Sequence, residues 1–345
     1  MIVDNFGLLA FSFLINSFSI KILYFKSESL SLMDSPSKRK IHTNAVPSIG
    51  GLAIFLTLFF LACSKSGYIS ELLSNINELL IFSITALGIF IIGIFDDMFV
   101  LSAKIKIVFQ LFLTLVVIFG LSLDQTFIIP LVNNYFANLF LEVIFILGIT
   151  NSINLIDGID NLAALLSILI SISLFIVSIL IGFNSSIFIF LIGSLSAHIF
   201  YNIYISRLFL GDSGSLLLGW IFAIFSLLFV KYSNITTMHI PFLILGIPAF
   251  DVIYVMYNRF SKRYYSTYSN RLGNMFLPDN NHIHHNLINR GWSSNKVCLT
   301  LFFYSLILSL ISICILFFIE EYIYRSLVVF VIVTIFLQFR FKNDI

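Results

Sequence analysis

Charged residues are scarce in this sequence. They make up 10% of its 345 residues, whereas 59% are hydrophobic and the mean hydropathy is +1.04. Soluble domains are about a quarter charged, so a water-soluble globule is excluded. Forty phenylalanines and only six prolines also exclude intrinsic disorder, which requires low hydrophobicity and high charge. The composition therefore indicates a protein that crosses a membrane several times.

Cysteine and net charge are also low. Cys63, Cys298 and Cys314 lie in or beside apolar segments, with no CxxC pair and no Cys/His ligand spacing. Neither a disulfide framework nor a zinc site is expected from them. The net charge of +2, from 19 basic and 17 acidic residues, is too balanced for a protein that binds nucleic acid.

Apolar runs of about 20 residues, the length needed to cross a bilayer, define the expected architecture. We expect an all-α polytopic membrane protein with one transmembrane domain over 1–345 and about eleven helices. The spans lie near 5–25, 49–64, 79–95, 106–123, 135–151, 162–182, 186–202, 214–231, 238–258, 297–318 and 322–339. No small-x-small cleavage site follows the first run, so it is a retained helix and not a signal peptide.

Basic residues set the expected sidedness. With the N-terminus outside and the C-terminus in the cytoplasm, fifteen lysines and arginines fall in inner loops and three in outer loops. This is a clear positive-inside bias. The inner loops are 26–48, 96–106, 151–161, 203–213 and 259–296, and they also hold most of the acidic and amide-rich clusters. The sequence thus predicts one chemically active face, on the cytoplasmic side.

The first cluster is Asp96-Asp97, at the end of the third span, followed by Lys104 and Lys106. Adjacent carboxylates at a membrane boundary are costly unless they bind a cation or handle a proton. The two lysines supply enough positive charge to hold a phosphate. A pair of carboxylates that merely caps the helix end is the competing explanation, and the pair alone does not decide between them.

The second cluster occupies 151–161. Asn151, Asn154, Asp157 and Asp160 recur every three residues, which puts them on one face of a helical turn. Carboxylate and amide oxygens are the ligands that Mg²⁺ prefers, with phosphate as a further ligand. A polar turn that caps the sixth span, with Asp160 or Asn161 as N-cap, explains one of the four residues.

Two further clusters follow. Phe209-Leu-Gly-Asp-Ser-Gly-Ser215 precedes the eighth span, where glycines and a helix N-terminus suit an anion, although a turn with a serine cap is the alternative. It lacks the spacing and lysine of a Walker A loop. The loop 259–296 carries arginines, tyrosines and three histidines. Without a spaced Cys or further His these histidines fit a phosphate or sugar better than zinc, and a solvated basic loop is the alternative.

Together the clusters supply oxygen ligands for Mg²⁺, cations for phosphate and a polar loop large enough for a headgroup. This set fits phosphoryl transfer, in which positioning and charge neutralisation carry most of the catalysis. Because the site is expected at the inner surface of the bilayer, one reactant should be a lipid and the other cytosolic.

Five ordered motifs resemble those of the polyprenyl-phosphate N-acetylhexosamine-1-phosphate transferases. This family includes UDP-GlcNAc:undecaprenyl-phosphate GlcNAc-1-phosphate transferases and, more distantly, phospho-N-acetylmuramoyl-pentapeptide transferases. The motifs are Arg39-Lys-Ile-His-Thr with Pro47-Ser-Ile-Gly-Gly, Asp96-Asp97 with Leu101-Ser-Ala-Lys-Ile-Lys106, Asn151 to Leu162, Phe209 to Gly219, and Asp279 to His285. The resemblance covers nearly the whole chain.

The resemblance implies a reaction, partners and a location. A cytosolic UDP-activated amino sugar and undecaprenyl phosphate would give undecaprenyl-diphospho-sugar and UMP, the first step of a surface glycan such as O-antigen. Mg²⁺ would be the cofactor, with Mn²⁺ as the alternative ion. The protein would lie in the bacterial inner membrane with its site on the cytoplasmic face, and a homodimer is left open.

The resemblance also implies roles for single residues. Asp212 and Asn154 would contact the metal with Asp97 nearby, and Asp96 would be the candidate base. The nucleotide pocket would be shaped by Asp157, Asp160 and Asn161, with Phe209 near the uracil. Phosphate would be held by Lys106 and Lys104, and Arg271, His282, His284 and His285 would bind the sugar-phosphate side. Direct displacement needs fewer assumptions than a covalent acyl-phosphate on an aspartate.

Two departures from the family pattern bear on the sugar. Asn161 replaces the second glycine of its motif, and the spacer before the histidines is longer than usual. N-acetylglucosamine is the first expectation, followed closely by a deoxy-amino sugar such as a fucosamine (FucNAc) or quinovosamine (QuiNAc) derivative, whereas a peptidoglycan precursor is least favoured.

The alternatives to a transferase are a transporter or lipid flippase and an inactive scaffold. A transporter or lipid flippase would show repeated halves and acids at mid-span, yet the sequence has no repeat and its acids gather at one interface. An inactive scaffold would be indifferent to substitution of Asp212.

Overall fold

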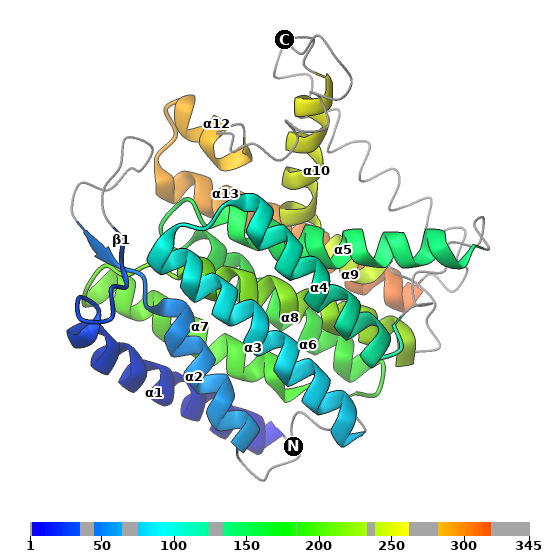
Figure 1. The fold of residues 1–345 in the computed structure, drawn as a ribbon, viewed down its shortest axis with the longest axis horizontal. Coiled ribbons are helices and arrows are strands. Elements are labelled where there is room, and N and C mark those ends of the chain that lie inside the picture. The colour runs from blue at the N-terminus through cyan, green and yellow to red at the C-terminus, as the bar shows by residue number, and fades with distance from the viewer. Residues whose placement is uncertain are drawn as a thin grey trace.

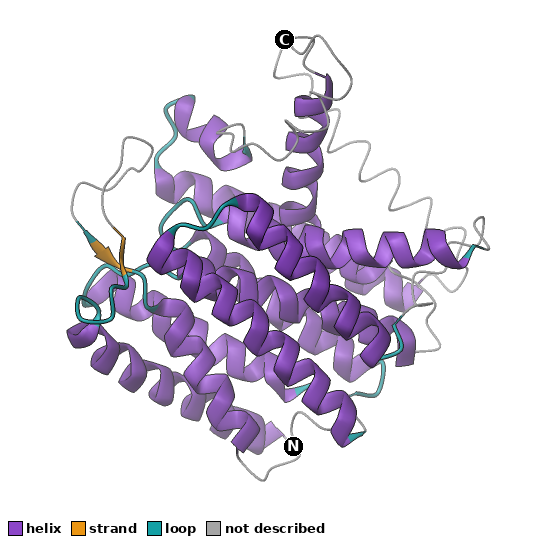
Figure 2. Cartoon of the chain, in the orientation of Figure 1, coloured by secondary structure: helices purple, strands orange, loops and turns teal. Residues whose placement is uncertain are grey.

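The chain is described here from a computed structural model, over residues 2–34, 45–63, 75–123, 134–183, 185–232, 239–261 and 282–318. Within these ranges the chain is almost entirely helical (Figure 2). The helices are α1 (Ile2–Lys26), α2 (Gly50–Cys63), α3 (Ile76–Phe99), α4 (Ala103–Gly120), α5 (Tyr135–Ile156), α6 (Leu162–Leu180), α7 (Ser186–Tyr204), α8 (Gly211–Tyr232), α9 (His239–Ile244), α10 (Gly246–Ser261), α12 (Ile283–Asn289) and α13 (Ser294–Phe318). Two short strands, β1 (Met33–Asp34) and β2 (Val46–Pro47), pair antiparallel.

Eight of these helices are long and apolar enough to cross a membrane: α1, α3 to α8, and α13. The prediction of an all-helical chain with many spans is confirmed in this coarser form. The expected spans near 49–64 and 238–258 correspond to shorter apolar helices, and the one near 322–339 lies outside the described residues.

The expected span near 238–258 is divided between α9 and α10 at Leu245. Pro248 explains the division, because a proline has no backbone N–H and its ring clashes with the carbonyl group four residues earlier. That carbonyl group belongs to Ile244, the last residue of α9. Proline is tolerated in the first turn of a helix, and Pro248 lies in the first turn of α10.

Helix α8 is the central element of the bundle (Figure 1). It is buried along nearly its whole length and packs against α2, α3 and α5. Glycines allow these neighbours to approach its backbone closely. A Cβ atom at Gly93 of α3 would lie 2.4 Å from the Cα of Ser213, and one at Gly51 of α2 would lie 2.1 Å from the backbone N of Gly214.

The helix ends that carry the motifs meet at one end of the bundle. There α3 ends and α4 begins, α5 ends and α6 begins, and α7 ends and α8 begins. The predicted loops are shorter than expected, because Asp96 and Asp97 still belong to α3 and the segment from Asn151 to Ile156 still belongs to α5. These side chains are therefore held on regular helix and not on mobile loops.

Candidate active site

A cavity of about 410 Å³ opens among these helix ends. Six aspartates contribute to its lining, and Arg207 is the only arginine or lysine among the described lining residues. The aspartates are Asp34, Asp96, Asp97, Asp157, Asp160 and Asp212. A cavity lined by so many carboxylates attracts cations, or a ligand that carries a bound cation.

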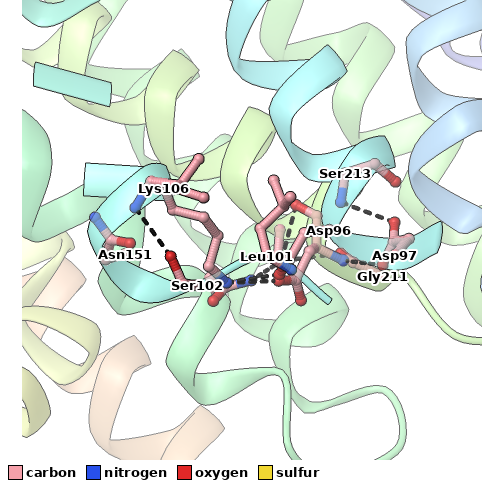
Figure 3. A network of polar contacts seen from close by, with 12 residues as sticks. Asp96, Asp97, Leu101, Ser102, Lys106, Asn151, Gly211 and Ser213 are labelled. Atoms are coloured by element: carbon pink, nitrogen blue, oxygen red, sulfur yellow. Dashed lines mark hydrogen bonds and ion pairs between the residues drawn. The ribbon is translucent and has the colours of Figure 1, made fainter. Parts of the chain in front are cut away.

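Asp97 joins α3 to the start of α8. One carboxylate oxygen accepts the backbone N–H of Asp212 at 2.8 Å and the hydroxyl of Ser48 at 3.3 Å, and the other accepts the N–H of Ser213 at 3.1 Å (Figure 3). A carboxylate at a helix N-terminus satisfies unpaired N–H groups and interacts favourably with the helix dipole. Asp97 thus holds the backbone of Asp212 and Ser213 at the start of α8.

Lys106 lies between two carboxylates. Its ammonium nitrogen is 2.6 Å from an oxygen of Asp96 and 3.1 Å from an oxygen of Asp212. The other oxygen of Asp96 accepts the N–H of Leu101 at 2.6 Å. The ammonium group offsets the repulsion between two carboxylates that come from different helices. Asp96 and Asp212 line the cavity, and Lys106 pairs with them from outside the described lining.

The two motif asparagines near the end of α5, Asn151 and Asn154, form hydrogen bonds with different neighbours. Asn154 donates to the Ser215 hydroxyl at 3.0 Å, and its side chain is also hydrogen-bonded to Asp212. Asn151 instead donates to the side chain of Gln110 at 2.7 Å and to the Leu147 carbonyl oxygen at 2.8 Å. The predicted single face of four oxygen ligands is therefore incomplete, since α5 ends at Ile156 before the pattern does.

The turn from Asp157 to Asn161 forms part of the cavity wall. Burial, together with the nearby charges of Asp212 and Asp97, raises the pKa of Asp157 well above its usual value. Asp160 forms an ion pair with Arg207, which approaches from the segment between α7 and α8. Asp157 thus interacts electrostatically with Asp212, Asp97 and Asp160, and all four line the cavity.

The first and fourth motifs pair through their backbones. Ser48 and Phe209 form a parallel bridge, in which the N–H of Phe209 donates to the Pro47 carbonyl oxygen at 2.8 Å. The N–H of Gly50 returns a bond to the Phe209 carbonyl oxygen at 3.0 Å. This pairing holds Phe209 in the cavity lining, where the resemblance places it.

The three histidines begin α12. His282 is paired with the buried carboxylate of Asp251 at 2.7 Å, and the second Asp251 oxygen accepts the N–H of Ile283 at 2.7 Å. Burial, together with the neighbouring charge of His285, lowers the pKa of His284 to about 3. Burial also lowers the pKa of His285, and this is the histidine that lines the cavity. Both are uncharged at neutral pH.

Of the expected substrate-binding residues, Asn161, Phe209 and His285 line the cavity, whereas Lys106, His282 and His284 lie outside the described lining. Lys104 is exposed and is absent from the described lining, because residues two apart on a helix point to opposite faces. Arg271 lies outside the described residues.

The sequence interpretation missed several polar cavity residues, among them Asp34, Asn202 and Arg207, and it named Ser48 only as part of the first motif. Arg207 was used only to assign sidedness, although it is the only basic residue between the seventh and eighth spans. Its position just before the Phe209 motif is a signal that would have identified it. Asn202 is a neutral residue, and nothing in its local sequence distinguishes it.

The donor set fits Mg²⁺ better than a transition metal. No group of three or more His, Cys, Asp or Glu side chains gathers as a metal site within the described ranges. Mg²⁺ binds through one or two carboxylates together with substrate phosphates and water. Asp212 with Asn154 supplies such a set, and the ammonium of Lys106 shows that a cation is accommodated beside Asp212. Asp97 is less available, because each of its oxygens already accepts a hydrogen bond.

Comparisons with known proteins agree with this geometry. The profile of glycosyl transferase family 4 matches residues 79–230, which include the cavity ends of all six helices from α3 to α8. The chain is 33% identical over 319 residues to a probable undecaprenyl-phosphate N-acetylglucosaminyl 1-phosphate transferase of Bacillus subtilis, covering 90% of this chain and 83% of the relative. It is 29% identical over 298 residues to an undecaprenyl-phosphate alpha-N-acetylglucosaminyl 1-phosphate transferase of Thermotoga maritima, covering 86% and 87%. It is also 26% identical over 332 residues to a phospho-N-acetylmuramoyl-pentapeptide-transferase of Wolbachia, covering 89% and 96%.

Proposed function

The chain belongs to glycosyl transferase family 4, and from this premise we propose that it transfers an N-acetylated amino-sugar 1-phosphate from a UDP-sugar to undecaprenyl phosphate. The products are undecaprenyl-diphospho-sugar and UMP, and the reaction is the first membrane step of a cell-envelope polysaccharide. The observation that carries the proposal is the Asp96–Lys106–Asp212 group, whose two carboxylates line a cavity at the ends of membrane-spanning helices. UDP-N-acetylglucosamine is the favoured donor, because two of the relatives above carry that sugar in their names.

The proposed reaction joins two phosphates. An oxygen of the lipid phosphate attacks the phosphorus that bears the sugar, and the bond from that phosphorus to the bridging oxygen of UMP breaks. Repulsion between two anionic reactants opposes the attack, so cationic groups must screen it. Lys106 supplies one such charge. When bound by Asp212 and Asn154, Mg²⁺ would supply charge neutralisation for the diphosphate.

Asp96 and Asp97 take different parts in this proposal. Asp96 lies in the cavity and is assigned to accept a proton from the lipid phosphate, so that the phosphate is fully ionised. Both oxygens of Asp97 are engaged by the first turn of α8. A covalent phosphate on Asp97 would require these bonds to break, which supports direct displacement and makes Asp97 a positioning residue.

Remaining residues are assigned to the donor. Asp157, Asp160 and Phe209 line the part of the cavity proposed for the nucleotide, and His285 lines the sugar-phosphate side. His282 and His284 lie behind His285 in α12 and support it.

The donor is identified by one assay. We expect membranes that contain the protein to release UMP from UDP-N-acetylglucosamine only when undecaprenyl phosphate and Mg²⁺ are present. UDP-FucNAc and UDP-QuiNAc serve as competing donors in the same assay, and EDTA should abolish release in every case. A transporter or flippase, the alternative function, would release no UMP from any donor.

The proposed topology places this cavity on the cytoplasmic face of a bacterial inner membrane, with eleven spans, the N-terminus outside and the C-terminus inside. Cysteine labelling tests it in a variant whose three native cysteines are replaced by serine. We expect Asn295→Cys, an exposed position beside cavity residue Ser294, to react only from the cytoplasm. Asn75→Cys, exposed at the opposite end of α3, should react only from outside. The reverse pattern would invert the topology.

A further inference from the structure

A pair of amide side chains joins α4 to α5 close to the charged group around Asp212. The Asn151 amide nitrogen donates to the Gln110 carbonyl oxygen at 2.7 Å. It also donates to the Leu147 carbonyl oxygen at 2.8 Å, which anchors the side chain to its own helix. Gln110 is fully buried. The amide pair therefore links two membrane-spanning helices at a buried point of α4.

The amide pair is in register with two residues of the proposed site. Gln110 follows Lys106 by four residues on α4, and Asn151 precedes Asn154 by three residues on α5. Residues with these separations lie on the same side of a helix. Lys106 approaches Asp212 to 3.1 Å, and Asn154 is hydrogen-bonded to the same carboxylate. The two helices are thus connected twice, through Asp212 and, one turn further along, through the amide pair.

Stability does not explain the amide pair. The amide nitrogen of Gln110 is sealed in the interior, and it has no hydrogen-bond partner among the described residues. A buried N–H group without a partner costs at least as much free energy as one neutral hydrogen bond returns. An apolar side chain of the same length would therefore be tolerated at position 110. A buried polar side chain that adds no net stability is typical of a functional site.

We propose that Gln110 and Asn151 are positioning residues for Lys106. Helix α4 packs against α3 and α5, and the Lys106 side chain connects it to Asp212 of α8. The amide pair fixes how α4 is rotated and shifted against α5, so it sets where the ammonium group lies relative to Asn154. This inference rests on the proposed function, in which Lys106 screens the repulsion between two phosphates.

Gln110→Met tests the inference with a side chain of nearly the same length that lacks the amide. We expect kcat for UMP release to fall by about 10- to 100-fold, because a displacement of about 1 Å at a reacting group costs about 100-fold in rate. KM for the UDP-sugar should stay within about twofold, since the lost interaction acts in the transition state. The melting temperature should be unchanged or higher, because an unsatisfied N–H group is removed. A merely structural role would lower the melting temperature and leave kcat unchanged.

Thr114→Val is the matched control. Thr114 is buried one turn further along the same face of α4, and its hydroxyl has no partner among the described residues. Its kcat should therefore stay close to wild type. A loss of kcat in Thr114→Val as large as in Gln110→Met would assign the effect to the packing of α4 and overturn the inference.

A double variant shows whether the two amides act through one bond. Asn151→Leu removes the donor, and the combination Gln110→Met with Asn151→Leu should lose no more kcat than the more impaired single variant. Wild-type kcat in Gln110→Met, or fully additive losses in the double variant, would overturn the role of the amide pair and leave the proposed function intact. A wild-type protein that releases no UMP from any UDP-sugar would overturn both.

Discussion

Replacing Asp212 with asparagine is expected to lower sugar-phosphate transfer by about 100-fold or more. The substitution keeps the shape of the side chain and removes the charge that pairs with Lys106 and that is proposed to hold Mg²⁺. The backbone N–H of residue 212 still reaches Asp97, so α8 should keep its position. The measurement is UMP release by purified protein with saturating undecaprenyl phosphate.

A matched control uses a carboxylate at the other end of the same two helices. Glu78 of α3 pairs with Lys231 and Tyr232 of α8, far along both helices from the cavity. Glu78→Gln should therefore change turnover by no more than about twofold, since a single ion pair outside the site contributes little. Near-normal turnover in Asp212→Asn would contradict the proposed mechanism. If Glu78→Gln lost as much turnover as Asp212→Asn, the loss would be due to disturbed packing of α3 and α8 and not to the chemistry of the site.

Gly93→Ala is expected to inactivate the protein without touching a polar group. The added Cβ would lie 2.4 Å from the Cα and 2.6 Å from the backbone N of Ser213. Backbone atoms cannot rotate away, so α3 must move from α8 and the two bonds from Asp97 to the start of α8 must lengthen. A displacement of about 1 Å at a catalytic site costs about 100-fold in rate, and overpacking costs about 1–3 kcal/mol of stability.

Gly88→Ala is the control on the same helix. Its Cβ would lie 2.9 Å from both terminal methyl groups of Leu113 and 3.5 Å from the Leu113 Cγ, and this flexible side chain can rotate away. Turnover and melting temperature of Gly88→Ala should stay close to wild type, whereas both should fall in Gly93→Ala. Equal behaviour of the two variants would show that the close approach of α3 and α8 does not control the site.

Much of this molecule follows from its sequence, because hydrophobic length defines membrane helices and scarce charges mark the site. The prediction of many helical spans rested on that length, and eight helices meet it. The broken segment at Leu245 was less visible, since Pro248 interrupts an apolar run that otherwise reads as continuous. A run of about 20 apolar residues shows the length of a segment but not its backbone hydrogen bonding.

The sequence predicted which motifs form the site but not which of their residues contact one another. Asp96 and Lys106 are near in sequence, and their pairing could have been inferred from a short turn between α3 and α4. The bond from Asp97 to the N–H of Asp212 joins residues 115 apart, and it depends on which helices are neighbours in the bundle. The opposite directions of Lys104 and Lys106 follow from helical geometry alone and could have been predicted.

The long separation between Asp97 and its helix partner has a consequence for biogenesis. Membrane helices are made one after another, and a ribosome adds roughly 5–20 residues per second. Lys106 follows Asp96 within the next helix, so that charge acquires a partner almost at once. Asp97 must wait for a backbone made 115 residues later, about 6–20 s at that rate. During this interval the carboxylate has to remain hydrated at the membrane surface, and it becomes part of the interior only when α8 arrives between α3 and α5.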